Sequence, residues 1–110
     1  MMDSFIKTIE NFCADVHDWA KSKGWWDNER NEAELIALEH SELSEALEGM
    51  RHGNPPSEHI PDFSAVEEEL ADVVIRIADH SHAMGYRLGE AIVAKMEFNS
   101  GRPYKHGKMF

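Results

Sequence analysis

The placement of its four prolines constrains this chain more than any other feature of its sequence. Pro55, Pro56 and Pro61 fall within one short segment and Pro103 lies near the end, so every other stretch is free of proline. Proline interrupts a helix because it lacks a backbone N–H and because its ring clashes with the preceding turn. Long helices are therefore allowed on both sides of a central loop, and no sustained strand-like alternation competes with them.

Apolar residues recur at three- and four-residue steps in the proline-free stretches, which is the pattern of amphipathic helices. This periodicity predicts four helices: about residues 3–23, from a cap at Asp27 or Asn28 to about Met50, from Ser64 to before Gly85, and a shorter one that carries Leu88 and Met96. The chain has 110 residues and is 42% hydrophobic, which is enough for one modest core. We therefore expect one all-α domain over residues 1–110, arranged as a four-helix bundle and completed by self-association.

The start of the third predicted helix has the clearest local signal. Ser64 followed by Glu67 fits a capping box, in which each side chain bonds the backbone N–H of the other residue. The preceding segment, residues 51–63, is predicted to be a loop. The tail from Asn99 is expected to be irregular because glycines and a proline interrupt it.

Charge and cysteine content exclude several classes of protein. The chain has 21 acidic and 11 basic residues, a formal net charge of −10, whereas a protein that binds nucleic-acid polymers presents a basic face. No apolar run approaches the ~18 residues of a transmembrane helix, and the N-terminus lacks the pattern of a secretory signal. The single Cys13 forms no internal disulfide. We expect a soluble cytoplasmic protein with no nucleic-acid or membrane partner.

The second predicted helix carries a carboxylate where a core residue is expected. Glu39 lies at the centre of its apolar face. At ~100° per residue, the residues within about 40° of it are Leu35, Leu43, Ala46 and Met50. Glu42 lies about 60° to one side, on the same face. Because an unpaired buried carboxylate is costly, something must compensate it.

The third predicted helix repeats this pattern with Glu69 and Asp72, three residues apart and therefore on one surface. A single E-x-x-E pair is usually a solvated helix face, but two such pairs on consecutive helices favour a convergent site. If the helices pack together, Glu39, Glu42, Glu69 and Asp72 converge and repel one another unless a cation is bound. Ligands that are all oxygen select a hard ion, Mg²⁺ or alternatively Mn²⁺.

A basic tail follows in this acidic protein. Lys95, Arg102, Lys105 and Lys108 are four of its eleven basic residues, and Glu97 is the only acid from Lys95 onwards. Such a segment suits a polyphosphate, although basic tails are often simply solvated. An ion held by carboxylates, together with a cationic arm, predicts a site for a metal-bound nucleoside phosphate.

Two adjacent tryptophans, Trp25 and Trp26, follow Gly24 between the first two predicted helices. One of them is a candidate for stacking on a nucleobase or for sealing a subunit interface, because indoles combine a large apolar face with one polar N–H. Arg30 and Asn31 flank them as candidate partners for a base or sugar. The alternative, that both tryptophans pack in the core, stays open.

Two segments, LEHSELSEALEGMR (Leu38 to Arg51) and VEEELADVVIRIADH (Val66 to His80), carry a family resemblance. They resemble the MazG-like all-α nucleoside triphosphate pyrophosphohydrolases, whose signature is E-x-x-E, a spacer and E-x-x-D. Here it reads Glu39-His-Ser-Glu42 and Glu69-Leu-Ala-Asp72. The tail KMEFNSGRPYKHGKMF also resembles the C-terminal segment of compact phage- and integron-type members.

The resemblance implies hydrolysis of a (deoxy)nucleoside triphosphate to a monophosphate and pyrophosphate, in a role of nucleotide-pool house-cleaning. It implies Mg²⁺ ligands at Glu39, Glu42, Glu69 and Asp72. The water-activating residue would be one of these acids, with Glu39 and Glu42 as candidates, or the nearby Glu45. It also implies polyphosphate binding by Lys95, Asn99, Arg102 and Lys105, and a homodimer or homotetramer with the active site beside an interface.

Three other readings compete with this one. An HD-type metal phosphohydrolase is suggested by His17-Asp18, but its further ligands are not evident in the sequence. A di-iron bundle needs inward-facing Glu-x-x-His pairs, which the E-x-x-E motif does not provide. The stronger alternative is a non-catalytic acidic helical oligomer that binds nucleotide or a protein partner, which the sequence cannot distinguish from an enzyme.

Overall fold

The computed structural model describes residues 2–109, so residues 1 and 110 of the predicted domain lie outside it. Its elements are α1 (Met2–Ser22), α2 (Glu32–Arg51), α3 (Ala65–Ala83), α4 (Leu88–Ser100) and the short 3₁₀ helix η1 (Tyr104–Gly107). The all-α prediction is confirmed for the described residues, where the only β contact is an isolated bridge between Pro56 and Ser64.

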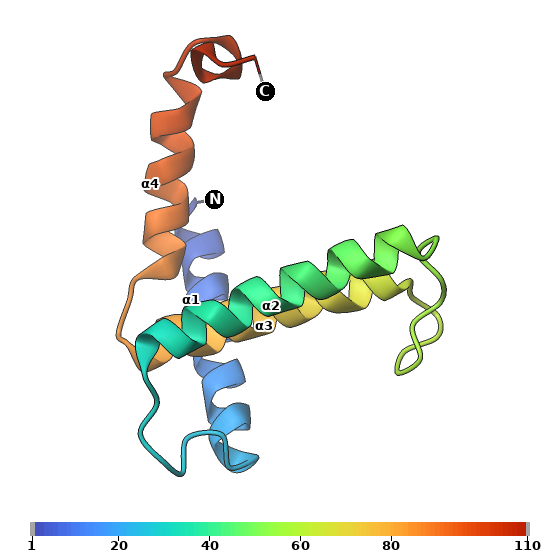
Figure 1. The fold of residues 1–110 in the computed structure, drawn as a ribbon. Helices are drawn as coiled ribbons and strands as arrows, with labels where there is room; N and C mark the ends of the chain where they lie inside the picture. Colours follow the sequence, from blue (N-terminus) through green and yellow to red (C-terminus); the bar gives the residue numbers. More distant parts are fainter. Residues whose placement is uncertain (1, 110) are drawn as a thin grey trace.

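The helices form two layers rather than one closed bundle (Figure 1). α2 and α3 lie side by side and antiparallel, α1 crosses α3, and α4 packs against α1. The far end of α4 and η1 project away from the α2–α3 pair (Figure 1). The four-helix bundle predicted from the sequence is therefore not closed within a single chain, because α4 has α1 as its main packing partner.

The capping signals explain where α2 and α3 begin. The capping box of α3 is confirmed, with Ser64 Oγ accepting from the Glu67 N–H at 3.1 Å and Glu67 Oε1 accepting from the Ser64 N–H at 3.0 Å. The predicted cap of α2 at Asp27 or Asn28 is wrong. Its N-cap is Asn31, because the side-chain oxygen of this residue reaches the first free backbone donors of the helix.

The turn after α1 follows the sequence prediction. Gly24 has φ +87°, a left-handed conformation that side chains with a Cβ disfavour, and the helix ends just before it. Residues 23–31 then lead across to α2. This segment carries both adjacent tryptophans and forms one wall of the site described below.

The buried face of α2 is rotated from the predicted position. Leu35, Glu42 and Ala46 are buried, whereas Leu43 and Met50 are 48% and 64% exposed. The apolar arc of α2 is wider than the strip that α3 covers, so the centre of the buried face lies at Glu42 and not at Glu39. Part of the apolar stripe read from the sequence thus remains on the surface.

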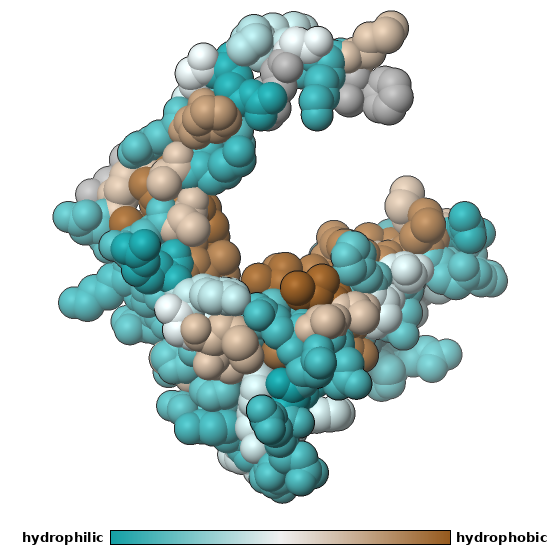
Figure 2. All heavy atoms as spheres, turned by 60° about the vertical axis from the view of Figure 1, so that its left-hand side comes forward, coloured by the Kyte–Doolittle hydropathy of each residue, from teal (hydrophilic) through white to brown (hydrophobic). Residues whose placement is uncertain are grey.

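The core of the single chain is thin. Its buried apolar residues are small or medium-sized, and no large side chain among the described residues is fully enclosed. Figure 2 shows the molecule hollowed on one face, with apolar surface gathered along the inner edge of the hollow. No helix of the described chain is both long and apolar enough to span a bilayer. Self-association would cover this apolar surface. That copies of the chain associate stays a prediction.

Candidate functional site

Three of the four predicted metal ligands come together between α2 and α3. Glu42, Glu69 and Asp72 each offer one carboxylate oxygen, and these oxygens all lie within 4.8 Å of one another. Glu42 projects from α2, and the other two come from successive turns of α3. The close packing of these two helices therefore creates the carboxylate cluster that the E-x-x-E and E-x-x-D spacing predicts.

Glu69 is the member of the cluster whose charge is least compensated. Burial, together with the neighbouring carboxyl groups of Glu45 and Glu42, raises its pKa to about 8. Its buried Oε2 atom has no hydrogen-bond partner among the described residues. A buried polar atom without a partner is costly, so this oxygen is open to an incoming ligand.

Arg76 provides the nearest compensating charge. Its Nε lies 3.3 Å from Glu42 Oε1. Even so, burial and the charge of Glu42 raise the pKa of Asp72 above its ordinary value, and Arg76 offsets this only in part. All-oxygen donors that repel one another fit a hard divalent ion such as Mg²⁺ or Mn²⁺.

Glu45 lies at the edge of the cluster. It is exposed, and its carboxyl group contributes to the raised pKa of Glu69. An exposed carboxylate next to a candidate ion site is placed to contact a water molecule there. The structure thus puts this predicted catalytic residue beside the cluster but outside its three converging ligands.

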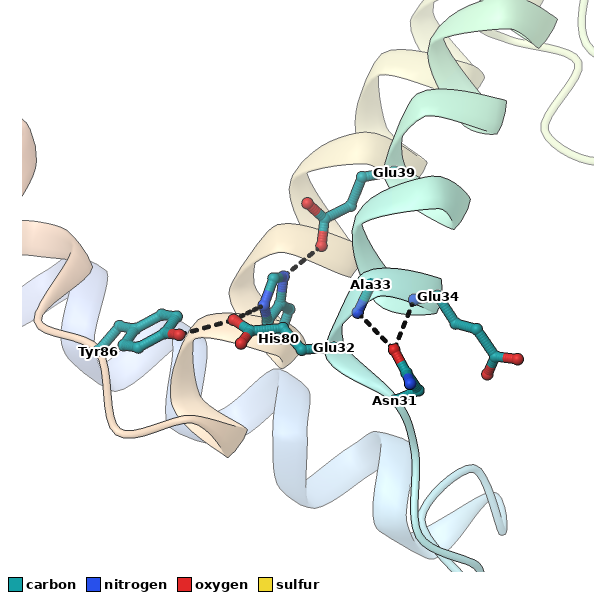
Figure 3. Close-up of polar contacts among 7 residues, drawn as sticks. All are labelled: Asn31, Glu32, Ala33, Glu34, Glu39, His80 and Tyr86. Atoms are coloured by element: carbon teal, nitrogen blue, oxygen red, sulfur yellow. Dashed lines mark hydrogen bonds and ion pairs between the residues drawn. The ribbon is translucent and has the colours of Figure 1, made fainter.

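Glu39 is placed differently from the prediction. It is absent from the group of converging carboxylates, and its Oε2 lies 2.6 Å from His80 Nδ1 across the α2–α3 interface (Figure 3). The other ring nitrogen of His80 lies 2.8 Å from Glu32 Oε2, which also accepts a 2.6 Å hydrogen bond from the Tyr86 hydroxyl. The prediction that four carboxylates converge is thus corrected to three, because a histidine on α3 engages Glu39.

Two carboxylates on one imidazole favour its protonated form. Burial by itself would lower the pKa of His80, but the hydrogen bonds to Glu32 and Glu39 outweigh this effect and raise the pKa above its ordinary value. An imidazolium can donate from both ring nitrogens at once, as this geometry requires. The periodicity of α2 does not indicate which residue of α3 lies opposite Glu39, so His80 was not predicted as its partner.

A pocket of about 230 Å³ opens beside the carboxylate cluster. It shares Glu42 and Asp72 with the cluster. Its remaining lining comes from α1, from the segment after it and from α3: Val16, Trp19, Ala20, Trp25, Arg30, Ile75, Arg76 and Asp79. The pocket is therefore lined by carboxylate, aromatic and cationic side chains together.

The four predicted base-binding residues divide into two pairs. Trp25 and Arg30 line the pocket, and Trp19 of α1 lines it with them. Trp26 instead donates its indole N–H to Asp79, at 3.0 Å from Oδ1. Asn31 caps α2, so its side-chain oxygen is already engaged.

Asp79 is also the partner of His17, the residue that suggested the HD-type alternative. His17 Nδ1 lies 2.7 Å from Asp79 Oδ1, while Asp18 is exposed and approaches Lys21 at 3.8 Å. His17 and Asp18 therefore do not act on a common ion site in this structure. Together, His17 and Trp26 hold Asp79 at the wall of the pocket.

The predicted phosphate-binding residues lie elsewhere. None of Lys95, Asn99, Arg102 and Lys105 is among the residues that line the pocket. The Lys95 and Arg102 cations lie 4.5 and 5.6 Å from the Phe98 ring, and that of Lys105 lies 5.8 Å from the Tyr104 ring. Because α4 projects away from the α2–α3 pair (Figure 1), one chain does not bring its basic tail to its own carboxylate cluster.

Comparisons of the chain with protein families, with curated proteins and with solved structures give no match.

Proposed function

We propose that this protein hydrolyses nucleoside triphosphates to a nucleoside monophosphate and pyrophosphate, with Mg²⁺, or alternatively Mn²⁺, held by Glu42, Glu69 and Asp72. One observation carries the proposal. The cluster of Glu42, Glu69 and Asp72 adjoins a pocket that is lined by two of its members, Glu42 and Asp72, and by Trp19 and Trp25. A metal-bound triphosphate attached to a planar base presents groups that complement both kinds of side chain.

The carboxylate cluster supports a resident divalent ion. Three negative groups within 4.8 Å repel one another, and the raised pKa of Glu69 reflects that repulsion and its burial. When bound, such an ion neutralises charge on the phosphates and lowers the pKa of a water molecule. The unpartnered Glu69 Oε2 gives the ion a ready ligand atom.

The chain's own cations and aromatic rings would position the substrate. Arg30 and Arg76 also line the pocket, and a guanidinium can bind phosphate oxygens through two parallel hydrogen bonds. The indoles of Trp19 and Trp25 offer flat apolar surfaces against which a base can stack. Glu45, exposed beside Glu69, would orient and deprotonate the attacking water.

Self-association is part of the proposal. The single chain has a thin core and leaves large apolar side chains of α2 exposed, among them Leu43, Leu47 and Met50. In a homodimer or homotetramer, the basic tail of a second copy would supply Lys95, Asn99, Arg102 and Lys105 to the polyphosphate. A role in nucleotide-pool house-cleaning in the cytoplasm would follow from this reaction.

One alternative is favoured by the separation of the site residues. Because Glu39 is engaged by His80 and the basic tail lies apart from the cluster, the same pocket would also serve an acidic helical oligomer that binds nucleotide without hydrolysing it. The two functions differ in turnover and not in where the nucleotide is held.

Measuring pyrophosphate release separates these functions. The wild-type protein is incubated with a panel of nucleoside triphosphates with and without Mg²⁺, beside Asp72→Asn and the matched surface control Glu97→Gln. We expect Mg²⁺-dependent pyrophosphate release that Asp72→Asn abolishes and that Glu97→Gln leaves unchanged. Nucleotide binding without release would favour the alternative, and release of orthophosphate would contradict both.

A further inference from the structure

The face of α3 that lines the pocket carries charged groups in a fixed order. Asp72, Arg76 and Asp79 all line it, at spacings of four and three residues that place them on one helix face. At ~1.5 Å of rise per residue, Arg76 lies about 6 Å and Asp79 about 10.5 Å along the helix from Asp72. The pocket thus runs from the carboxylate cluster, past a cation, to a second and separate carboxylate.

The hydrogen bonds of Asp79 leave one acceptor position open. Its Oδ1 accepts from His17 Nδ1 at 2.7 Å and from Trp26 Nε1 at 3.0 Å, which occupies both lone pairs of that oxygen. Its Oδ2 shares the same indole N–H at 3.1 Å and retains a lone pair. The carboxylate is therefore fixed from α1 and from the segment after it, with one oxygen free to accept another donor.

The surroundings of this oxygen suit a base rather than a second cation site. Trp19, Trp25 and Ile75 line the same pocket, so a planar ring entering it is flanked by apolar surface. Asp79 lies outside the group of converging carboxylates, and Arg30 also lines this pocket. A triphosphate held at Asp72 and Arg76 would direct its base towards Asp79.

We infer that Asp79 is a specificity-determining residue that accepts a hydrogen bond from an exocyclic amino group of the nucleobase. This inference rests on the proposed function and names its substrate class: nucleotides whose base carries such an amino group, in preference to uracil or thymine. A base with a carbonyl in that position would direct an oxygen at the carboxylate, and two acceptors that face each other form no hydrogen bond. Sites built around one hydrogen bond reject analogues that lack it by large factors.

The test uses pairs of nucleotides that differ in this group and in the hydrogen on the ring nitrogen beside it. The α,β-imido analogues of dCTP and dUTP present an amino group and a carbonyl, respectively, at the same ring position, and those of dATP and dITP repeat the contrast on a purine. Equilibrium binding is measured calorimetrically with Mg²⁺ and the full chain. We expect the wild-type protein to bind the amino-bearing member of at least one pair about tenfold tighter or more.

Asp79→Asn reports on the role of the carboxylate itself. The amide keeps an oxygen for His17 and Trp26 and adds an N–H₂ that can donate to a carbonyl, so we expect the preference to vanish or reverse. Asp18→Asn, an exposed change on α1, is the matched control and should leave the preference intact. The wild-type comparison needs no variant, so it decides the question even if Asp79→Asn fails to fold.

Each other outcome overturns the inference in a distinct way. Equal binding of both members of each pair by the wild-type protein would refute the inference and leave the proposed function standing. If Asp79→Asn weakens the binding of both analogues of a pair equally, Asp79 only supports the segment between α1 and α2. If the wild-type protein binds none of the four analogues with Mg²⁺, the proposed function fails together with the inference.

Discussion

Two groups of carboxylates lie on the same pair of helices, and the chain neutralises them to very different extents. Glu32 and Glu39 meet His80, whose two ring nitrogens lie 2.8 and 2.6 Å from their oxygens (Figure 3). Further along the same interface, Glu69 and Asp72 meet Glu42, with Arg76 at 3.3 Å from Glu42 as the compensating contact. The first group is a structural ion-pair network, and the second has the charge imbalance of a ligand site.

The comparison shows why helix position alone does not define an ion site. Glu39 and Glu42 are one turn apart on α2, and both are largely buried. What separates them is the residue that α3 presents opposite each: a histidine in one case and two further acids in the other. The same side chain can therefore link two helices or bind an ion, depending on its partner.

The largest expected effect is on hydrolysis, and it compares Glu69→Gln with Glu39→Gln. Glu69→Gln should lower pyrophosphate release on the order of 10²–10³-fold, since it removes a ligand of the proposed ion. It should leave stability unchanged or higher, because glutamine resembles the protonated carboxyl group that a pKa of about 8 implies at neutral pH. Glu39→Gln should do the reverse and destabilise the fold while hydrolysis stays within a few fold.

Parallel assays of pyrophosphate release and urea unfolding on both variants measure this contrast. If Glu39→Gln lowers hydrolysis as much as Glu69→Gln does, Glu39 is also a ligand of the working site, as the sequence resemblance implies. The distinction between the two groups of carboxylates would then fail.

The next effect concerns stability and tests whether His80 holds its group together. His80→Gln leaves Glu32 and Glu39 without a cationic partner, and loss of one member of a buried ion pair is strongly destabilising. We expect a cost of about 3 kcal/mol in the free energy of unfolding, at the low end for buried pairs because Glu32 is partly exposed. Urea denaturation measures it, with the exposed His40→Gln as the matched control.

A loss in His80→Gln no larger than that in His40→Gln would contradict the ion-pair network. The pH dependence offers a second check on the same residue. Because the folded state raises the pKa of His80, its stabilising contribution is complete below about pH 6.5 and disappears as the pH rises through the folded value. His80→Gln should remove that alkaline decline.

The two groups of carboxylates could be predicted from the sequence to different extents, because they depend on different kinds of information. The Ser64 capping box and the acid spacing are local, and they correctly placed the start of α3 and the convergence of Glu42, Glu69 and Asp72. The pairing of Glu39 with His80 depends on how α2 rotates against α3. A helix wheel gives the faces of one helix but not the residue that a neighbour places opposite each face.

The pocket shows the same limit. Trp25 and Arg30 were predicted to contact a base or sugar, and both line the pocket, although their contact with a nucleotide stays a prediction. The contacts of Asp79 could not be predicted in the same way, because nothing in the neighbouring sequence indicates that His17 and Trp26 bind it. The separation of the basic tail from the carboxylate cluster likewise follows from the direction of α4, which no local pattern specifies.

A smaller effect is expected when Mg²⁺ binds, and it distinguishes the Glu42, Glu69 and Asp72 cluster from the carboxylates that contact His80. A carboxyl group whose pKa rises from 4.5 to about 8 on folding makes the ion-free fold less stable as the pH increases through that window. Mg²⁺ must displace the proton of Glu69, so its affinity should rise about tenfold per pH unit up to about pH 8. The shift in melting temperature produced by Mg²⁺ should therefore be larger at pH 8 than at pH 6.

Thermal unfolding with and without Mg²⁺ at the two pH values tests this, and Glu69→Gln should abolish the dependence on pH. His80→Gln serves as the control from the other group and should retain it. An equal Mg²⁺ shift at both pH values in the wild-type protein would mean that no proton leaves Glu69 when the ion binds.

The smallest expected effect comes from the periphery of the His80 group. The Tyr86 hydroxyl donates a 2.6 Å hydrogen bond to Glu32, and this bond, followed by that to His80, lowers the pKa of Glu32. A carboxyl group with a lowered folded pKa contributes stability above its unfolded value and loses it as the pH falls through the folded one. Tyr86→Phe removes the first bond and brings the folded pKa of Glu32 closer to its unfolded value, so the acid decline in stability should be smaller and should end at a higher pH. Because Tyr86 is 53% exposed, the loss at neutral pH should be smaller than that of Glu39→Gln. An unchanged acid limb in urea unfolding between pH 3 and pH 6 would mean that His80 alone keeps Glu32 ionised.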